Sequence, residues 1–459
     1  MTLTRKVATA LVLTALTVLS ATLPAQAAGS TLLWSTASKS ANIGLSVEPK
    51  VAVNGSVQAV SWIQRTGADS STLNVRVLRD GVWGSAEILA TSEWDWWDAF
   101  DVQVSSSGKV YVAEQTGDVT MTVFSSSALG VWSTTTIDTM SSSLGALEVS
   151  GTVHGGVVAF TSSRADSNRS ATLTTYVFDE ANAFAGWSTT AVDTFTASYF
   201  SACTVKNNYY DSCAIDANES QIAIADDGSE VLFTSVSRDS ANGYPAGLQF
   251  KIFKYHRADS ASAWVKDGAV YTLTLGKGAT GYSFFLSTIA TTAAGKYGIA
   301  LTTGSTSNTV RLYTGDTFAS APVAKDATYL ASLKNTDYPS VVFFNNELYA
   351  SFDARGAHKF GKVGSLSSTT RSLSSAKDNQ EVKNLLVIGG RIVAVIATPK
   401  SGTYLSTYTT KWSTASKVLS YAGDYSPMNG TAATDGTKLL IAAPKFSGHR
   451  MVGLYAYNN

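Results

Sequence analysis

Several short segments of the chain place aromatic residues beside acids and amides, a combination that can recognise a ligand. The densest of them is 92–98, which reads Ser-Glu-Trp-Asp-Trp-Trp-Asp. Aromatic rings stack on the C–H faces of sugars, while carboxylates and amides form hydrogen bonds with sugar hydroxyls. We therefore expect a lectin-like, carbohydrate-binding surface that takes a glycan as its partner. Its candidate residues are Trp94, Trp96, Trp97, Asp98, Tyr209, Tyr210, Tyr282, Asp337, Tyr338, Asp378, Asp424 and Tyr425.

Acids in the same segments leave a catalytic function open. Glycoside hydrolysis needs two carboxylates about 5 to 9 Å apart that face one cleft. The candidate acids are Glu93, Asp95, Asp98, Asp337, Asp378, Glu381 and Asp424. Sequence alone places no two of them at that separation, so the catalytic residues stay unknown. A glycoside hydrolase or lyase is the first alternative to a binding protein, and a cell-surface scaffold for protein interactions is the second.

Metal chemistry has little support in the sequence. The four histidines are widely separated and lack the spacing of metal ligands, so we expect no metal and no cofactor. They are His154, His256, His358 and His449. An Arg-Ala-Asp-Ser phrase at 164 and 257, shortened to Arg-Asp-Ser at 238, could contact calcium or an anion. Turns favour the same residues, and we interpret the phrase as a turn.

A repeat predicts the elements that position these residues. A tryptophan that follows a turn and precedes a β-like run recurs along the chain. It is found at Trp83, Trp132, Trp187, Trp264 and Trp412, with Phe318 in the same role and a weaker copy at Leu366. The steps between these markers are roughly 46 to 77 residues, a period typical of propeller blades. We interpret the recurring tryptophans, together with Trp34 near the N-terminus, as residues that pack the blades together.

Each period contains four short alternating runs separated by Gly, Ser and Asp. The runs 100–104, 109–113, 119–124 and 131–137 are one example. This spacing predicts a four-stranded antiparallel sheet, and no helical period competes with it in the mature chain. The predicted fold class is therefore all-β, a closed β-propeller of about eight four-stranded blades.

The two ends of the chain share a phrase that predicts how the ring closes. The run Trp34-Ser-Thr-Ala-Ser-Lys39 is repeated residue for residue as Trp412-Ser-Thr-Ala-Ser-Lys417. The C-terminal part supplies three runs from Gly430 onward and stops about where the next tryptophan is due. The strand of Trp34 is therefore predicted to complete the last blade, which removes an open sheet edge. This count gives eight blades, or seven or six if the copies at 318 and 366 belong to one unit.

The predicted ring also gathers the candidate ligand-binding residues. Connections from an outer strand to the next inner strand lie on one face beside the central channel, and function usually resides on such loops. The aromatic and acidic segments fall in these connections. Trp96 or Trp97 could instead plug the channel or pack between blades.

Phrases such as Glu48-Pro-Lys-Val-Ala-Val-Asn-Gly55 and Asp80-Gly-Val-Trp83 resemble the sialidase-like and Asp-box propellers and related secreted bacterial repeat proteins. The resemblance covers most of the mature chain and implies the propeller architecture. A full Asp-box, Ser-x-Asp-x-Gly-x-x-Trp, is not present in the sequence, and Asp80–Trp83 is a contracted relative of it. The arginine cluster and the tyrosine–glutamate pair of that family find no matching positions, so the resemblance assigns no catalytic residue.

The N-terminus predicts export. Arg5 and Lys6 precede an apolar run, 7–19, and the small-residue pattern Ala25-Gln-Ala27. We expect residues 1–27 to be a bacterial-type secretory signal peptide and 28–459 a single secreted propeller domain. No later run is long enough for a membrane span.

The chain has two cysteines, Cys203 and Cys213. Export would place them in an oxidising compartment, which favours a local disulfide inside an insertion at about 195–218. The chain carries 34 basic and 34 acidic residues without a basic stripe. This balance argues against a nucleic-acid partner. We expect an extracellular monomer.

Overall fold

The computed structural model describes residues 31–35, 44–45, 49–67, 70–92, 99–116, 120–139, 145–154, 156–167, 170–196, 222–225, 228–238, 248–267, 271–274, 287–292, 294–303, 309–325, 336–354, 357–364, 381–398, 402–420, 431–446 and 450–458. Most of these residues lie in β-strands, and the one helical element among them is the 3-10 helix η1 (Glu180–Ala185). The all-β prediction is therefore confirmed.

The described strands form eight antiparallel sheets, which we number in chain order. Sheet 1 contains β2 (Gly44–Leu45), β3 (Lys50–Asn54), β4 (Val57–Arg65), β5 (Ser71–Arg79), β6 (Val82–Trp83) and β7 (Glu87–Ser92). Sheet 2 contains β8 (Ala99–Val104), β9 (Val110–Thr116), β10 (Thr120–Ala128) and β11 (Val131–Thr139). Sheet 3 contains β12 (Gly145–His154), β13 (Val157–Ser167), β14 (Ser170–Asp179) and β15 (Ser188–Thr196). Sheet 4 contains β16 (Ile222–Ile224), β17 (Glu230–Arg238), β18 (Leu248–His256), β19 (Val265–Lys266) and β20 (Tyr271–Thr274).

The second half of the chain repeats the arrangement. Sheet 5 contains β21 (Ser287–Thr291), β22 (Tyr297–Thr303), β23 (Thr309–Gly315) and β24 (Val323–Lys325). Sheet 6 contains β25 (Thr336–Phe344), β26 (Glu347–Ala354) and β27 (Ala357–Lys362). Sheet 7 contains β28 (Glu381–Ile388), β29 (Arg391–Thr398), β30 (Gly402–Tyr408) and β31 (Ser416–Ser420). Sheet 8 contains β32 (Thr431–Thr434), β33 (Lys438–Phe446), β34 (Arg450–Asn458) and the N-terminal strand β1 (Thr31–Ser35).

Each sheet is covered on both faces because its strands alternate between two neighbours. In β33, Leu440 and Ala442 pack against sheet 1, whereas Leu439 and Ile441 pack against sheet 7. Successive side chains of a strand point to opposite faces of the sheet. A strand that is buried on both faces therefore has an almost continuous apolar run. The apolar runs of the central strands therefore hold each sheet between two others.

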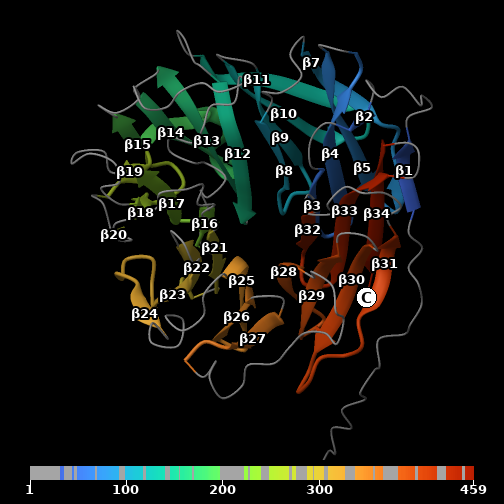
Figure 1. Cartoon of the computed structure of the whole chain (residues 1–459). Helices are drawn as coiled ribbons and strands as arrows, with labels where there is room; N and C mark the ends of the chain where they lie inside the picture. Colours follow the sequence, from blue (N-terminus) through green and yellow to red (C-terminus); the bar gives the residue numbers. More distant parts are fainter. Residues whose placement is uncertain are drawn as a thin grey trace, which may run out of the picture.

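The eight sheets close into a ring (Figure 1). The innermost strands β3, β8, β12, β16, β21, β25, β28 and β32 contact one another in this order, and β32 contacts β3 again. Eight hydrophobic clusters of described residues lie between neighbouring sheets, one at each junction, including the junction of sheets 8 and 1. The structure is thus an eight-bladed propeller with a core divided among its blade interfaces.

The two weaker copies of the repeat form separate sheets. Phe318 is fully buried and follows β23 of sheet 5, where it packs edge-on against Tyr297. The next sheet, built from β25, β26 and β27, has its own apolar contacts on both sides. Leu366 lies outside the described residues. The prediction of eight blades is therefore confirmed, and the alternative counts of seven or six blades do not hold.

The N-terminal strand completes the last sheet, as the sequence predicts. β1 pairs antiparallel with β34, with Thr31 opposite Leu454 and Ser35 opposite Met451. The order within sheet 8 is β1-β34-β33-β32, so β1 is its outermost strand (Figure 1, blue beside red).

The two copies of the Trp-Ser-Thr-Ala-Ser-Lys phrase do not occupy equivalent positions. Trp34 lies within β1 opposite Val452, whereas Trp412 lies before β31 and forms an isolated bridge with Tyr408. In both β1 and β31, one residue is left out of the pairing with the neighbouring strand. Counted from this bulge, Trp34 of β1 stands at the same position as Leu419 of β31. Leu419 is buried. The two outer strands therefore share the position of their bulge, with Leu33 skipped in β1 and Val418 skipped in β31, although the shared phrase lies at different positions relative to it.

Polar contacts also join the last sheet to the first. The Gly55 N–H donates to Asp435 Oδ2 (3.0 Å), and Lys438 Nζ donates to the Gly55 carbonyl. Thr431 Oγ1 donates to the Pro49 carbonyl (2.8 Å). We call Asp435, Lys438 and Thr431, with their partners Gly55 and Pro49, the seam clasp. The clasp joins residues about 380 positions apart in the sequence.

Acid is expected to weaken the seam clasp. Burial acts to raise the pKa of Asp435, but hydrogen bonds from Lys438, Thr437 and Gly55 outweigh it and hold this pKa below its ordinary value. A carboxyl group with a lowered folded-state pKa stabilises the fold above its unfolded pKa of about 3.9 and loses that contribution as pH falls through the folded value.

We therefore expect Asp435→Asn to lose less stability than the wild-type protein between about pH 5 and about pH 2. Urea unfolding across this range measures the difference. The same pH dependence in both proteins would contradict the role of the carboxylate.

Candidate functional site

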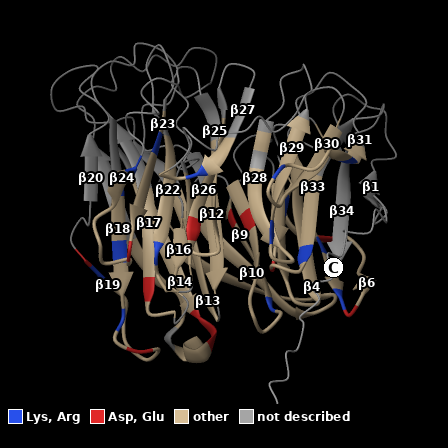
Figure 2. Ribbon diagram, turned by 90° about the horizontal axis from the view of Figure 1, so that it is seen from below, with Lys and Arg blue, Asp and Glu red and all other residues tan. Residues whose placement is uncertain are grey.

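The hairpin turns of the sheets gather at one edge of the ring, which we call the turn edge. Turns between first and second strands contact their neighbours directly, as where the Gly389 N–H donates to the Gly436 carbonyl (2.8 Å). The turns that follow the third strands lie at the same edge. For example, Arg79 Nη1 at the end of β5 donates to the Gly108 carbonyl (2.6 Å) of the next sheet. Figure 2 shows these turns along its lower edge.

The opposite edge, which we call the connection edge, is where the chain passes from one sheet to the next. Innermost strands run from this edge to the turn edge, so each sheet-to-sheet connection begins and ends at the connection edge. The segments that carry the candidate ligand-binding residues belong to these connections or to the strand ends that border them. They lead from β7 to β8, from β15 to β16, from β20 to β21, into β25, into β28 and from β31 to β32.

Most candidate ligand-binding residues lie outside the described residues. Asp337 and Tyr338 belong to β25, but the structure does not describe their side chains. The residues outside the description are Trp94, Trp96, Trp97, Asp98, Tyr209, Tyr210, Tyr282, Asp378, Asp424 and Tyr425, together with Cys203 and Cys213. The binding roles and the disulfide therefore stay predictions, while the strands that flank these segments are placed.

A half-buried carboxylate on an innermost strand was missed by the sequence reasoning. Asp101 lies on β8, three residues beyond the segment 92–98, and its Oδ2 accepts the Gly151 N–H of the next sheet (2.6 Å). The same oxygen accepts Gln103 Nε2 (3.3 Å), and Oδ1 accepts the Val102 N–H (2.8 Å). The signal for this residue is an acid within an alternating apolar strand, where Phe100, Val102 and Val104 are buried.

Burial raises the pKa of Asp101, although the positive charge of Lys50 and the hydrogen bonds from Val102 and Gly151 act in the opposite direction. The hydrogen bond between Asp101 and the Gly151 N–H requires a glycine at position 151. A Cβ atom at this position would lie 2.5 Å from the Phe160 ring and 3.1 Å from Asp101 Oδ2. The absence of a side chain at Gly151 therefore lets two innermost strands approach closely enough for the carboxylate to reach the backbone.

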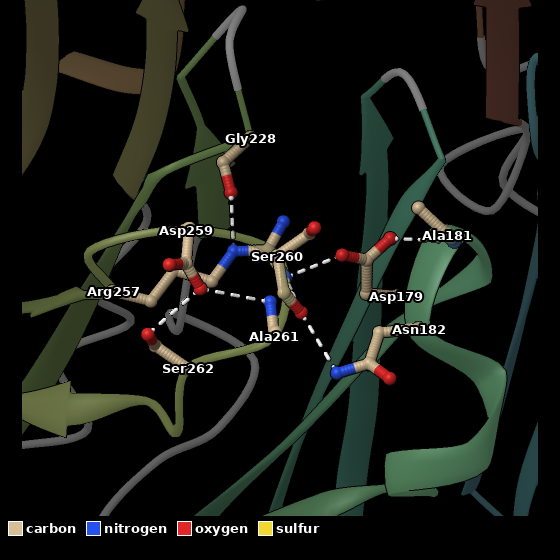
Figure 3. A network of polar contacts seen from close by, with 9 residues as sticks. All are labelled: Asp179, Ala181, Asn182, Gly228, Arg257, Asp259, Ser260, Ala261 and Ser262. Atoms are coloured by element: carbon tan, nitrogen blue, oxygen red, sulfur yellow. Dashed lines mark hydrogen bonds and ion pairs between the residues drawn. The ribbon is translucent and has the colours of Figure 1, made fainter.

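At the turn edge, a polar network joins sheets 3 and 4 (Figure 3). Arg257 and Asp179 form an ion pair through Nη1 and Oδ2, and their side chains are only 6% and 8% exposed. Arg257 Nε also donates to the Gly228 carbonyl (3.1 Å), and its guanidinium lies over the Trp264 ring, 4.8 Å from the centroid. Asp179 Oδ1 accepts the Ala181 N–H (2.8 Å) and caps η1.

The Arg-Ala-Asp-Ser phrase at 257 forms a turn, as interpreted from the sequence. Asp259 Oδ1 accepts the Ala261 N–H (3.0 Å) and the Ser262 hydroxyl (2.8 Å). The hydrogen bond from Ser262, which has the largest effect, and that from Ala261 lower the pKa of Asp259. Arg257 forms an ion pair with Asp179 of the neighbouring sheet, and Asp259 stabilises the turn, so contacts with protein groups explain both residues at this site.

The residue after Asp179 joins sheet 3 to sheet 2. Glu180 Oε1 accepts Ser105 Oγ (2.7 Å), Ser107 Oγ (3.1 Å) and Tyr111 Oη (2.7 Å). Burial and the contact with Glu180 raise the pKa of Tyr111 far above its ordinary value. Two consecutive acids therefore tie three neighbouring sheets together, and protein donors already occupy the carboxylate oxygens that make these contacts.

The recurring tryptophans whose side chains are described pack the blades together, as predicted, while the side chain of Trp34 lies outside the description. Each of them packs, partly buried, against a cluster that joins two sheets. They are Trp83, Trp132, Trp187, Trp264 and Trp412. Trp187 is an example, since its ring stacks on Phe178 with centroids 5.1 Å apart. These rings thus belong to the core and not to a binding surface.

No group of three or more His, Cys, Asp or Glu residues within the described ranges could hold a metal ion. No helix in the described part of the chain is long and apolar enough to cross a membrane.

The ring of eight sheets defines the class of the protein as a β-propeller. No family model and no curated protein sequence matches the chain. Solved propellers resemble it at low sequence identity. The propeller domain of the trilobed protease from Pyrococcus furiosus is 10% identical, with a TM-score of 0.42, and the match covers 82% of this chain and 99% of that one.

Two further structures extend the comparison. An α-L-arabinofuranosidase of Fusarium graminearum, solved with arabinobiose, is 12% identical over 79% of this chain and 92% of its own, with a TM-score of 0.38. The polysaccharide lyase Uly1 is 9% identical over 90% of each chain, with a TM-score of 0.44. At such identities the resemblance concerns the fold alone.

Proposed function

We propose that the protein binds a glycan at the connection edge. The observation that carries this proposal is topological. The segments that carry the candidate ligand-binding residues lie in the connections between neighbouring sheets or at the strand ends that border them, so the ring brings these segments to the same edge. Segments hundreds of residues apart in the sequence would then act on one ligand.

The chemistry of the two edges differs in a way that favours this site. At the turn edge, the acids Asp179, Glu180, Asp259 and Asp435 accept hydrogen bonds from protein groups. The connection edge combines tryptophan and tyrosine with acids, the pairing that suits the apolar faces and hydroxyls of sugars. The protein would act outside the cell if residues 1–27 direct its export.

The test is a glycan array followed by calorimetry with the strongest ligand, comparing the wild-type protein with the double variant Trp96→Ala, Trp97→Ala. Loss of two stacking rings is expected to weaken binding by about 1–3 kcal/mol, or about 5- to 150-fold. Phe184→Ala is the matched control, because Phe184 is a fully exposed aromatic residue in η1 at the turn edge. Its binding should equal that of the wild type.

Three outcomes would overturn the proposal. Unchanged binding in a folded double variant would remove the aromatic segment from the site. Absence of binding to any glycan would favour the scaffold alternative. Release of sugar from a panel of polysaccharides and aryl glycosides by the wild-type protein would instead identify a glycoside hydrolase or lyase.

A further inference from the structure

The last sheet is held in the ring by contacts that do not involve its N-terminal strand. β33 packs against the first sheet through Leu440 and Ala442, which join Trp62 in one cluster. On its other face, Leu439 and Ile441 pack against sheet 7. Because these residues are almost fully buried, the apolar contacts of β33 anchor sheet 8 from both sides.

The seam clasp reinforces this anchoring, again without β1. Asp435 and Lys438 bind the N–H and the carbonyl of the same residue, Gly55. Asp435 Oδ1 also accepts the N–H groups of Thr437 (2.8 Å) and Lys438 (2.7 Å), which orients its other oxygen toward Gly55. The turn that makes the clasp belongs to β32 and β33.

β1 itself is an outermost strand attached along a single neighbour. Four register pairs connect it to β34, from Thr31 opposite Leu454 to Ser35 opposite Met451. Its place in the sheet order gives it no second partner strand among the described strands. Without β1, β34 would present a row of unpaired N–H and carbonyl groups, which is a template for another strand.

We propose that the outer edge of β34 is an exchangeable strand-binding site, and that it accepts residues 31–35 from a second copy of this chain as well as from its own. The ring stays closed when β1 leaves, because the apolar contacts of β33 and the seam clasp hold sheet 8. Exchange of an identical element between copies is a low-cost route to a dimer. Main-chain hydrogen bonds along the edge supply the affinity, as in other strand additions.

The test uses the full chain with Leu32→Pro and Leu33→Pro together. Successive residues of a strand direct their N–H groups to opposite sides, and proline has no N–H, so the pair removes ladder donors from β1. The probe is a fluorescent peptide of residues 29–37, and its binding is measured by fluorescence polarisation. The variant should stay folded and bind the peptide at least about 10-fold more tightly than the wild-type protein, whose site is occupied.

Two controls define specificity. The same peptide with Leu32→Pro and Leu33→Pro together should not bind the variant. Adding Asp435→Ala and Lys438→Ala to the variant should weaken the attachment of sheet 8, which amide exchange in peptides of β33 reports as reduced protection. The variant with the clasp intact should keep that protection.

The remaining outcomes all count against the proposal. Unfolding of the proline variant, or loss of β33 protection while the clasp is intact, would show that β1 holds the ring closed. A folded variant that does not bind the peptide would show that the edge of β34 accepts no strand in trans. None of these results depends on glycan binding, so this proposal and the proposed function fail separately.

Discussion

Replacing Asp179 with alanine is expected to lower the free energy of unfolding by about 3–5 kcal/mol. The substitution leaves the guanidinium of Arg257 almost fully buried, with 6% of its side chain exposed, and without its acidic partner. A buried charge that loses its ionic partner retains the cost of leaving water without the attraction that offset it. Urea unfolding monitored by circular dichroism measures the change.

An exposed ion pair provides the matched control. Lys362 and Glu347 lie 2.9 Å apart, with side chains 41% and 50% exposed. Glu347→Ala should therefore change stability by at most about 1 kcal/mol. Replacing both buried partners, Asp179→Leu with Arg257→Met, should restore most of the stability, because no unpaired charge remains. If Asp179→Ala were as mild as Glu347→Ala, the buried pair would not have the role assigned to it.

Trp62→Ala is expected to destabilise the protein by about 3–5 kcal/mol. The Trp62 side chain is fully buried in the cluster where sheet 8 meets sheet 1. Its removal leaves a cavity at the junction that closes the ring. Thermal and urea unfolding measure the loss, and increased amide exchange should appear first in peptides from β33 and β4.

Phe184→Ala is the control for the loss of an aromatic side chain. Phe184 is fully exposed, so its truncation should change stability by no more than about 0.5 kcal/mol. Equal effects of Trp62→Ala and Phe184→Ala would mean that the junction of the first and last sheets is not packed as described.

Much of the fold follows from the sequence because each blade repeats one local pattern. Alternating apolar runs, turn residues and a tryptophan before the outer strand recur along the chain, so sheet number and order can be counted. The closure by β1 also follows, since three C-terminal runs leave one strand missing. The shared phrase at Trp34 and Trp412 identified the correct strand, although the two residues differ in register.

Contacts between blades could not be predicted in the same way. Nothing near Asp179 in the sequence marks Arg257 as its partner, because the two residues are 78 positions apart. Glu180 likewise accepts hydrogen bonds from residues of the preceding sheet, 69 to 75 positions away. Such pairs depend on how neighbouring sheets are rotated against each other, which local pattern does not determine.

The edge of the ring at which the candidate segments lie could be predicted from the sequence. Sequence reasoning assigned the aromatic and acidic segments to one face, and the strand order places the ends of these segments at the connection edge. Asp101 escaped notice because its surroundings read as an ordinary apolar strand. The Gly151 N–H that it binds belongs to another sheet.

Hydrogen exchange with and without the bound glycan tests the proposed site most directly. We predict that the ligand slows exchange in peptides that span the sheet-to-sheet connections, those covering 92–99, 334–340, 376–384 and 421–431. Peptides of the turn edge, such as 54–57, 105–109 and 292–296, should exchange at unchanged rates. Protection confined to the turn edge, or to the outer strands, would contradict glycan binding at the connection edge.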